Sequence, residues 1–454
     1  MAFGRTKPLS GFDTMKAFSA RDWLSFRTVV LIAPVFMLTV KHWISAAVFF
    51  TAIAAMVWLA RHRDTRPLPA EPVIPWRRWA AWSMAGPIIA VGLGQAFRGE
   101  FFLGNFDPPL RILLCVPIFL AVSQGWLHRR DATPVVASWL KVILPLTLVW
   151  TCFYRVMWPV AWEGGRYTTR FVDPLSFGSL CLMFALLSLA GLWLFKGRSR
   201  LAQVGVVVSV ACGVFLSVTS GSKTGWLSVP VLAALGMMLA VRHAAQPRRW
   251  LLGGAVGLAL LAVLVLMNPL FVSRLSETVP EALSYHWQSM NPDGSTQIRI
   301  SLWRMGWFYF LQSPLGGWGD LGWRVLMDSP ALTVFASQFT REFAAHGFHS
   351  EIMTSTVRSG VWGLVSSIGL FLVPWLCSRR LSAGWLTPLL KPTLWFVWIV
   401  LLHQGLAGLS TEVTALIFQA SFFGLCLSVG LGEAVFQYRM ANAAASDTTS
   451  KTPA

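Results

Sequence analysis

Charged residues are scarce in this chain. They make up 12% of its 454 residues, whereas an average soluble domain has about 25%, and 55% of the residues are hydrophobic. So few ionisable side chains cannot cover the surface of a soluble protein of this length. The composition therefore excludes the soluble globular class and predicts a membrane protein.

Several chemical signatures are also missing. None of the six cysteines forms a CxxC pair and all lie in or beside apolar runs, so neither disulfides nor a zinc site is expected. The chain has no glycine-rich loop of the ATP-binding type, and no closely paired acidic residues that suggest a divalent metal site. No apolar segment near the N-terminus suggests a cleavable signal peptide. We therefore expect no cofactor and no metal.

Apolar runs long enough to cross a bilayer, about 20 residues each, recur along nearly the whole chain. About twelve are present, which predicts an all-α polytopic integral membrane protein. The runs centre on residues 28–40, 43–60, 79–96, 111–127, 133–153, 174–195, 202–219, 225–241, 250–272, 356–377, 392–410 and 413–435.

The spacing of these runs divides the chain into five parts. An N-terminal segment (1–27), expected in the cytoplasm, precedes the first nine spans (28–272). A longer segment (273–355) forms an extramembrane subdomain between the ninth and tenth spans. The last three spans (356–436) precede a small polar tail (437–454), which is expected to be cytoplasmic and disordered.

Basic residues outnumber acidic residues by 37 to 19. If the spans alternate from a cytoplasmic N-terminus, the basic stretches "RHRDTR", "HRRD", "KGRSR", "RHAAQPRR" and "SRR" all fall on the cytoplasmic side. This is the positive-inside pattern, and it places both termini in the cytoplasm. The charge excess thus reflects topology, and no nucleic-acid partner is expected.

Two longer segments on the opposite side offer the only room for a site, namely Arg155–Pro174 and 273–355. The second contains an amphipathic helix, because four apolar residues recur at helical spacing and the following "PLGGWG" predicts its end. The residues of this apolar face are Ile298, Leu302, Met305 and Tyr309.

Four motifs lie on this side of the membrane. They are "RFVDPLSFGSLCL" (170–182), "LSVTSGSKTGWLSVPVL" (216–232), "RISLWRMGWFYFLQSPLGGWG" (299–319) and "HSEIMTSTVRSG" (349–360). Together they resemble the O-antigen ligase and polymerase superfamily of bacterial membrane glycosyltransferases, and its O-antigen ligase branch most. Lys223 stands where this family more often has arginine, and Ser350 stands where it commonly has asparagine.

The resemblance implies an O-antigen ligase of the bacterial inner membrane, with an architecture like that of the GT-C glycosyltransferases. Such an enzyme transfers a glycan from undecaprenyl pyrophosphate to a sugar hydroxyl of lipid A-core at the periplasmic face. The leaving group is already activated, so the reaction requires no ATP, and cationic side chains are expected to take the place of a metal. The implied partners are the lipid-linked donor, lipid A-core and membrane lipids.

Cations on the periplasmic side are the candidates for holding pyrophosphate. Arg170, Lys223 and Arg299 come from separate segments, and such side chains bind phosphate oxygens through charge-assisted hydrogen bonds. Further substrate-binding candidates are Arg166, Arg304 and Trp226. For Arg304, a contact with lipid headgroups is an equally good expectation.

His349 is the predicted catalytic base, because a neutral imidazole can accept the proton of the acceptor hydroxyl and the spacing to Gly360 matches the family. His346 has no family counterpart and is expected to make an interfacial contact. His403 is expected to be a buried polar contact between helices. Glu351 is two residues from His349 and is expected to point elsewhere. A single base without a carboxylate nucleophile suggests direct displacement with inversion.

Two alternatives to the ligase share parts of this pattern. An O-antigen polymerase or a protein O-oligosaccharyltransferase would use the same base and cations on another acceptor. A transporter or flippase would perform no chemistry. Transporters commonly contain internal repeats and charges near the bilayer midplane, whereas this chain shows no duplicated halves and almost all its charges lie at span boundaries.

Overall fold

The computed structural model describes residues 20–62, 74–128, 133–194, 199–243, 247–382 and 390–449. Within these ranges the regular secondary structure is helical apart from one antiparallel hairpin, β1 (Val160–Trp162) and β2 (Arg166–Thr168). Eight helices or helical runs of this described part are long and apolar enough to cross a membrane. The predicted all-α polytopic membrane architecture is therefore confirmed.

The eight spans coincide with eight of the predicted apolar runs. They are α2 (Trp43–Arg61), α3 (Ile74–Arg98), the run of η1 (Leu103–Phe106), α4 (Asp107–Leu113) and α5 (Cys115–Val122), the run of α6 (Val135–Ser138), η2 (Trp139–Ile143) and α7 (Leu144–Met157), α8 (Pro174–Leu194), α9 (Arg200–Thr219), α17 (Glu351–Ser382) and α19 (Ile417–Thr449).

The other four predicted runs fall on α1 (Ala20–Ile32), α10 (Ser228–His243), α11 (Pro247–Leu266) and α18 (Leu390–Ala407). The first of these predictions, a span over 28–40, is wrong as a continuous helix. α1 ends at Ile32 and residues 33–42 form turns. Pro34 accounts for this end, because proline lacks an N–H donor and disfavours helical geometry in the residue before it.

The C-terminal boundary also differs from the prediction. α19 continues to Thr449, so the tail predicted to be disordered from residue 437 is helical as far as 449. The sequence "ANAAA" within this stretch has strong intrinsic helix propensity, which the small polar residues around it conceal. Residues 450–454 lie outside the described part of the chain, as do residues 1–19 of the N-terminal segment.

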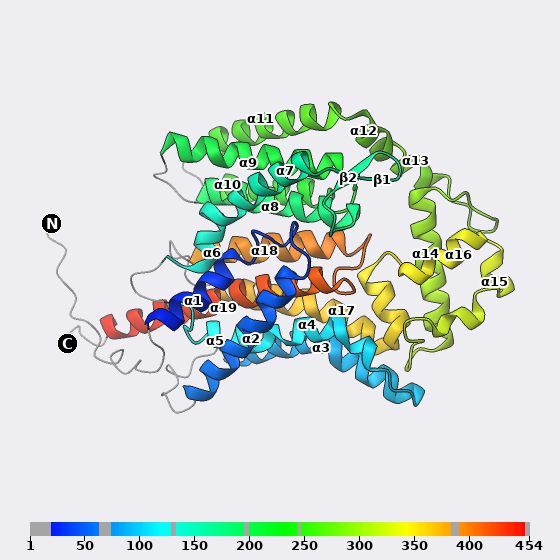
Figure 1. Ribbon diagram of the computed structural model, residues 1–454, viewed down its shortest axis with the longest axis horizontal. Coiled ribbons are helices and arrows are strands. Elements are labelled where there is room, and N and C mark those ends of the chain that lie inside the picture. The colour runs from blue at the N-terminus through cyan, green and yellow to red at the C-terminus, as the bar shows by residue number, and fades with distance from the viewer. Residues whose placement is uncertain are drawn as a thin grey trace.

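The segment predicted as an extramembrane subdomain over 273–355 corresponds to residues 269–350 in the structure, here called the insert, which lie at one end of the stack of long helices, beside the β1–β2 hairpin (Figure 1). Its core contains Leu302, Met305 and Tyr309, so the predicted apolar face of this helix is buried. The elements of the insert are α12 (Pro269–Ser276), α13 (Thr278–Leu283), α14 (Ser295–Gln312), η3 (Gly322–Leu326), α15 (Pro330–Thr333), α16 (Gln338–Phe343) and η4 (Ala344–His346).

α17 is broken at Gly360, whose backbone angles are φ 63° and ψ −144°. The turn 314–319 of the insert fills this break with its backbone. The N–H of Val361 donates to the Pro314 carbonyl (2.7 Å), and the N–H of Trp318 donates to the Val357 carbonyl (2.8 Å). Backbone groups released by the break are thus satisfied by the insert instead of by the helix itself.

Glycine is required on both sides of this junction. A Cβ atom on Gly360 would lie 2.3 Å from the Pro314 carbonyl oxygen, and one on Gly317 would lie 2.6 Å from the Arg358 carbonyl oxygen. Arg98 at the end of α3 also donates to the Arg358 carbonyl (3.1 Å). The glycines of "PLGGWG" and "RSG" therefore join the insert to the membrane helices.

We expect Gly360→Ala to destabilise the protein, because it adds about 1–3 kcal/mol of backbone strain and a contact with the Pro314 carbonyl. The matched control is Gly369→Ala in the same helix, where an added Cβ meets nothing within 4 Å. Thermal unfolding of the purified variants should show a lower midpoint for Gly360→Ala alone. Equal midpoints for the two variants would contradict this role of the junction.

Candidate active site

Lys223 lies in the turn between α9 and α10, at the same end of the helix stack as the insert (Figure 1). Hydroxyl groups of the turn organise it: Ser222 Oγ accepts from the Thr224 N–H (3.2 Å) and donates to the Leu175 carbonyl of α8 (3.1 Å). The Lys223 ammonium is thereby directed at the insert, where it donates to Thr278 Oγ1 (2.9 Å).

His403 of α18 packs against this turn and is hydrogen-bonded to the two helices beside it. Its two ring nitrogens lie 3.0 Å from Ser179 Oγ of α8 and 2.8 Å from Ser228 Oγ of α10. The side chain has no exposed surface, and a Cβ on Gly225 would meet the ring at 2.7 Å. The prediction of a buried polar contact between helices is confirmed.

Arg299 lies on the first turns of α14. Its Nη1 donates to the Ser295 carbonyl (2.9 Å) and to Ser295 Oγ (2.7 Å), whereas its Nε is buried without a hydrogen-bond partner. Burial lowers the pKa of Arg299, and the nearby Glu281 and Glu412 carboxyl groups oppose this shift. The guanidinium thus retains an unused donor in a partly desolvated place.

Arg166 of β2 and Arg274 of α12 flank the Lys223 turn. A Cβ on Gly221 would lie 3.2 Å from both Arg166 Cγ and Arg274 Nη1. Burial lowers the pKa of Arg166, and the charges of Arg274 and then Arg299 lower it further. Sequence reasoning missed Arg274, because a basic residue just after an apolar run is typical of an interfacial anchor.

We call Arg166, Lys223, Arg274 and Arg299 the cation cluster. The pKa of Lys223 is lowered mainly by burial and then by Arg299, while Glu281 and Glu277 raise it. Burial is the main cause of the lowered pKa values of Arg166, Lys223 and Arg299, and repulsion by neighbouring cations adds to it for Arg166 and Lys223, so a bound anion would favour the charged forms. The cluster is therefore suited to binding a multiply charged anion.

His349 lies between the insert and α17, in the left-handed backbone region at φ 47°. Its ring stacks on Phe343, with 5.2 Å between centroids and 9° between planes. Burial, and next the Arg299 charge, lower its pKa to about 4, and a hydrogen bond to the Ser410 backbone opposes this shift. The imidazole is consequently neutral at physiological pH, and its Nδ1 is buried without a hydrogen-bond partner.

Glu412 is a second residue that sequence reasoning missed. It lies in the loop between α18 and α19, with 7% of its surface exposed, and Thr354 Oγ1 donates to its carboxylate (2.9 Å). Burial raises its pKa to about 7. No sequence motif surrounds it, so only its place just after a span on the insert side could have suggested it.

The structure does not join the other three predicted residues to the cation cluster. Arg170 is exposed and has no hydrogen bond or ion pair within the described part of the chain. The guanidinium of Arg304 packs 3.7 Å from the Phe335 ring centroid and donates to the Tyr285 hydroxyl (3.1 Å). Trp226 donates to Ser217 Oγ (3.1 Å) and packs against Phe271. Arg304 and Trp226 thus make packing contacts, and their predicted role in substrate binding stays a prediction.

Glu351 points away from the His349 ring, as predicted, because its carboxylate accepts hydrogen bonds from the N–H groups of Val413 and Thr414 (both 2.8 Å). His346 is exposed and contacts Phe343. Across the ranges that the structure describes, no three His, Cys, Asp or Glu side chains gather as a metal site would require. All six cysteines are free thiols.

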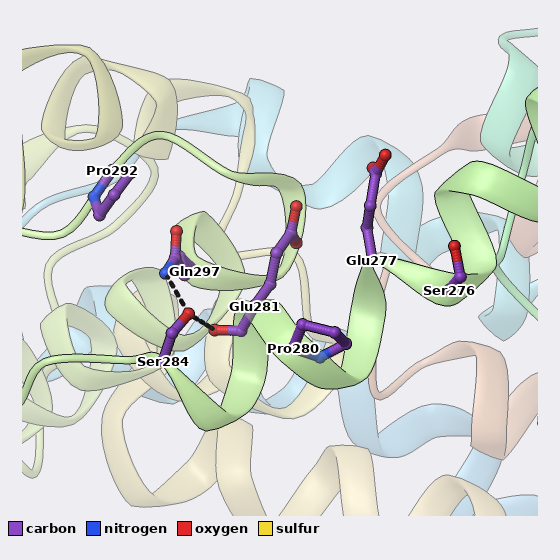
Figure 2. A pocket seen from close by; sticks show the side chains of 7 residues that line it. All are labelled: Ser276, Glu277, Pro280, Glu281, Ser284, Pro292 and Gln297. Carbon is purple, nitrogen blue, oxygen red and sulfur yellow. Dashed lines mark hydrogen bonds between the residues drawn. The ribbon is translucent and has the colours of Figure 1, made fainter.

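An open hollow of about 510 Å³ lies along α12, α13 and α14, and two of its lining residues, Glu277 and Glu281, interact electrostatically with Lys223. Figure 2 shows the carboxyl groups of Glu277 and Glu281 rising from the same segment, with Gln297 bonded to Ser284 beside them. Glu281 also accepts the N–H of Thr296 (2.7 Å), which satisfies a free donor at the start of α14. The hollow is thus walled by hydrogen-bonding groups next to Lys223.

Comparison with known families supports the resemblance seen in the sequence. Residues 208–346 match the family model described as O-antigen ligase. The matched region contains Lys223, Arg274 and Arg299, and it ends three residues before His349. No curated protein matches the chain.

The cation cluster predicts that inorganic pyrophosphate raises the unfolding temperature of the purified protein, because a ligand at 100 times its dissociation constant stabilises by about 2.7 kcal/mol. Arg299→Ala should weaken this binding about 10- to 100-fold, since charged hydrogen bonds contribute about 1.5–3 kcal/mol. Arg304→Ala is the control and should retain the pyrophosphate response even if its own unfolding temperature falls. An unchanged response in Arg299→Ala would contradict the assignment.

Proposed function

We propose that this multi-pass membrane protein, whose residues 208–346 match the O-antigen ligase family, is an O-antigen ligase. It would transfer a glycan from undecaprenyl pyrophosphate to a sugar hydroxyl of lipid A-core, without ATP or a metal. The match of residues 208–346 to a family of membrane glycosyltransferase-like enzymes supports the reaction type. The observation that carries the proposal is the neutral His349 beside Arg299. Arg299 belongs to the cation cluster, whose positive charges are only partly offset by nearby carboxyl groups.

The cation cluster would hold the donor's pyrophosphate. Arg299 has a free Nε donor, and Lys223 can exchange its bond to Thr278 for a phosphate oxygen. Negative charge on the phosphates grows as the bond to the sugar breaks, so cations fixed at this place stabilise the transition state more than the bound donor. Arg166 and Arg274 add positive charge beside Gly221 of the Lys223 turn.

His349 would act as the general base through Nδ1. Nδ1 is buried without a hydrogen-bond partner, which leaves it free to accept a proton. The acceptor oxygen attacks the anomeric carbon while the carbon–oxygen bond to phosphate breaks, and the hydroxyl proton passes to Nδ1. Undecaprenyl pyrophosphate leaves with the electron pair, and one displacement inverts the anomeric centre.

Donor binding would strengthen this base. The Arg299 charge contributes to the low pKa of His349 in the empty site. Phosphate bound to Arg299 brings negative charge next to the imidazole, which raises its pKa toward neutrality. The base would therefore gain proton affinity only when a donor is present.

The proposed topology places the insert in the periplasm of a bacterial inner membrane and both termini in the cytoplasm. In Figure 1 the start of α1 and the end of α19 lie at the end of the helix stack opposite the insert. Both substrates are amphiphiles, so their sugars must meet at the insert while their lipid tails remain in the bilayer. The hollow beside α13 offers hydrogen-bonding groups to those sugars.

The function is tested with purified protein in detergent, supplied with undecaprenyl-pyrophosphate-linked glycan and lipid A-core, without ATP or an ion gradient. The proposal predicts glycan joined to lipid A-core and release of undecaprenyl pyrophosphate. Glycan joined to a second donor would instead identify a polymerase, and glycan on a protein serine would identify an oligosaccharyltransferase. Donor moved across vesicle membranes without consumption would identify a flippase.

We expect His349→Ala to lower turnover about 10²- to 10⁴-fold, the usual effect of losing a general base, while donor binding stays nearly intact. Arg299→Ala should weaken donor binding and turnover together, because the charge it contacts exists before and during the reaction. Steady-state kinetics with matched amounts of folded protein separates the two patterns. Ligation at the wild-type rate by His349→Ala would show that this histidine serves packing.

Lys223→Arg should retain ligation, because it keeps the positive charge at the turn and supplies a guanidinium that binds phosphate with two donors. Lys223→Met is the matched variant, since it keeps the unbranched apolar stem but removes the charge. It should raise the KM for the donor in the same assay. Equal kinetics for the Arg and Met variants would exclude Lys223 from the donor site.

A further inference from the structure

The loop between α18 and α19 contacts His349 in addition to Phe343. Ser410 of this loop presents its backbone to the His349 ring, and Glu412 accepts the backbone N–H of His349. Thr354 Oγ1 joins the same arrangement, since it donates to Glu412 Oε1 (2.9 Å) and accepts the N–H of Phe348 (3.0 Å). The loop thus controls both the ring and the backbone of the predicted base.

The backbone around His349 lies close to the Glu412 carboxyl group. Two residues of this segment have a positive φ, Gly347 at 101° and His349 at 47°. A Cβ on Gly347 would lie 2.4 Å from Glu412 Oε1, which shows how closely the carboxyl group approaches the chain. A positive φ is unfavourable for a histidine, and the bond from its N–H to Glu412 supports it there.

Glu351 fixes the loop in the reciprocal direction. Its backbone N–H donates to the Gly408 carbonyl (2.8 Å), and its carboxylate accepts from Val413 and Thr414. The first turn of α17 therefore holds the loop, and Glu412 of the loop holds the chain just before α17. These mutual bonds leave Glu412 little freedom to move away from His349.

We propose that Glu412 is a positioning residue for catalysis, which fixes the orientation of His349 and supplies negative charge that stabilises the imidazolium formed when the base takes its proton. This inference rests on the proposed function, because it assigns Glu412 a part in the same reaction. Glu412 also acts electrostatically on Arg299, so one carboxylate faces both the base and the principal phosphate-binding cation.

The charge on Glu412 changes within the physiological range, because burial raises its pKa to about 7. The charged groups that face it are Arg299 from α14, Glu351 from α17, and His349 once protonated. Above pH 7 the carboxylate is ionised and supports the imidazolium, whereas below pH 7 it is neutral and this support is lost. Donor kcat/KM, which reports groups of the free enzyme, should therefore rise through pH 7.

The test compares Glu412→Gln, Glu412→Ala and Glu412→Asp with wild type in the ligation assay between pH 5.5 and 8.5, a range of about 1.5 units on each side of the expected step. Glu412→Gln keeps the shape but not the charge, so it should lower kcat about 10- to 100-fold and abolish the step in kcat/KM near pH 7. The donor KM should not rise, because removing a negative charge near Arg299 does not weaken phosphate binding. Glu412→Asp should retain the pH step at reduced kcat.

Hydrogen–deuterium exchange of the backbone amides tests the same idea without substrate. The amides of Phe348 and His349 should exchange faster in Glu412→Ala than in wild type. The His349 amide loses its acceptor, and Thr354, which accepts the Phe348 amide, loses its own bond to Glu412. Glu342→Gln, which alters an exposed carboxylate on α16, is the control and should leave exchange, kcat and the pH profile unchanged. If the Gln variant does not fold, Glu412→Asp provides both measurements.

The outcomes separate this inference from the proposed function. Unchanged kcat, pH profile and amide exchange in Glu412→Gln, with His349→Ala inactive, would overturn the role of Glu412 and leave the ligase intact. A fall in kcat with an unchanged pH step and unchanged amide exchange would also overturn it, since general destabilisation alone gives that pattern. Wild-type protein without ligation activity would overturn the proposed function, while the exchange measurement would still report on positioning.

Discussion

The break in α17 at Gly360 is the constraint on which the site depends. The insert is covalently continuous with the membrane helices at both of its ends. The turn 314–319 provides a third attachment, because it forms hydrogen bonds with the backbone groups that the break exposes. α14, which carries Arg299, ends just before this turn, and His349 precedes the first turn of α17. One backbone junction therefore sets the relation between the principal cation and the base.

The electrostatics of the site follow mainly from the burial of its cations. Burial lowers the pKa values of Arg166, Lys223 and Arg299, and neighbouring cations lower those of Arg166 and Lys223 further. Glu281 and Glu412 offset part of this unfavourable charge but form no salt bridge with these cations in the described part of the chain. Such an arrangement favours an anionic ligand, and it couples that ligand to the proton affinity of His349.

The sequence predicted the features that have local signatures. Apolar run lengths predicted the membrane helices, and the spacing from Ile298 to Tyr309 predicted the buried face of α14. Motif resemblance singled out Lys223, Arg299 and His349, and isolation within an apolar run suggested the buried contact of His403. In each case the residues within one segment contained the information.

The remaining features depend on contacts between distant segments. Arg274 joins the cations because α12 packs beside the β1–β2 hairpin, and Glu412 reaches His349 because the loop after α18 lies against the start of α17. Arg304 shares a helix with Arg299, yet aromatic side chains from two other parts of the insert surround it. The predictions of the first span and of a disordered tail were wrong for a different reason. Overall hydropathy does not show that Pro34 ends α1 or that an alanine-rich stretch extends α19.

The most direct test of the account is an electron cryomicroscopy structure of the protein in a lipid nanodisc with undecaprenyl pyrophosphate bound. The account predicts pyrophosphate density in contact with Lys223 and Arg299, with the terminal phosphate on the side that faces His349 Nδ1. Arg304 should remain in its aromatic surroundings, away from the ligand. Pyrophosphate bound elsewhere, with Lys223 still bonded to Thr278 and Arg299 still bonded to Ser295 alone, would contradict the shared site.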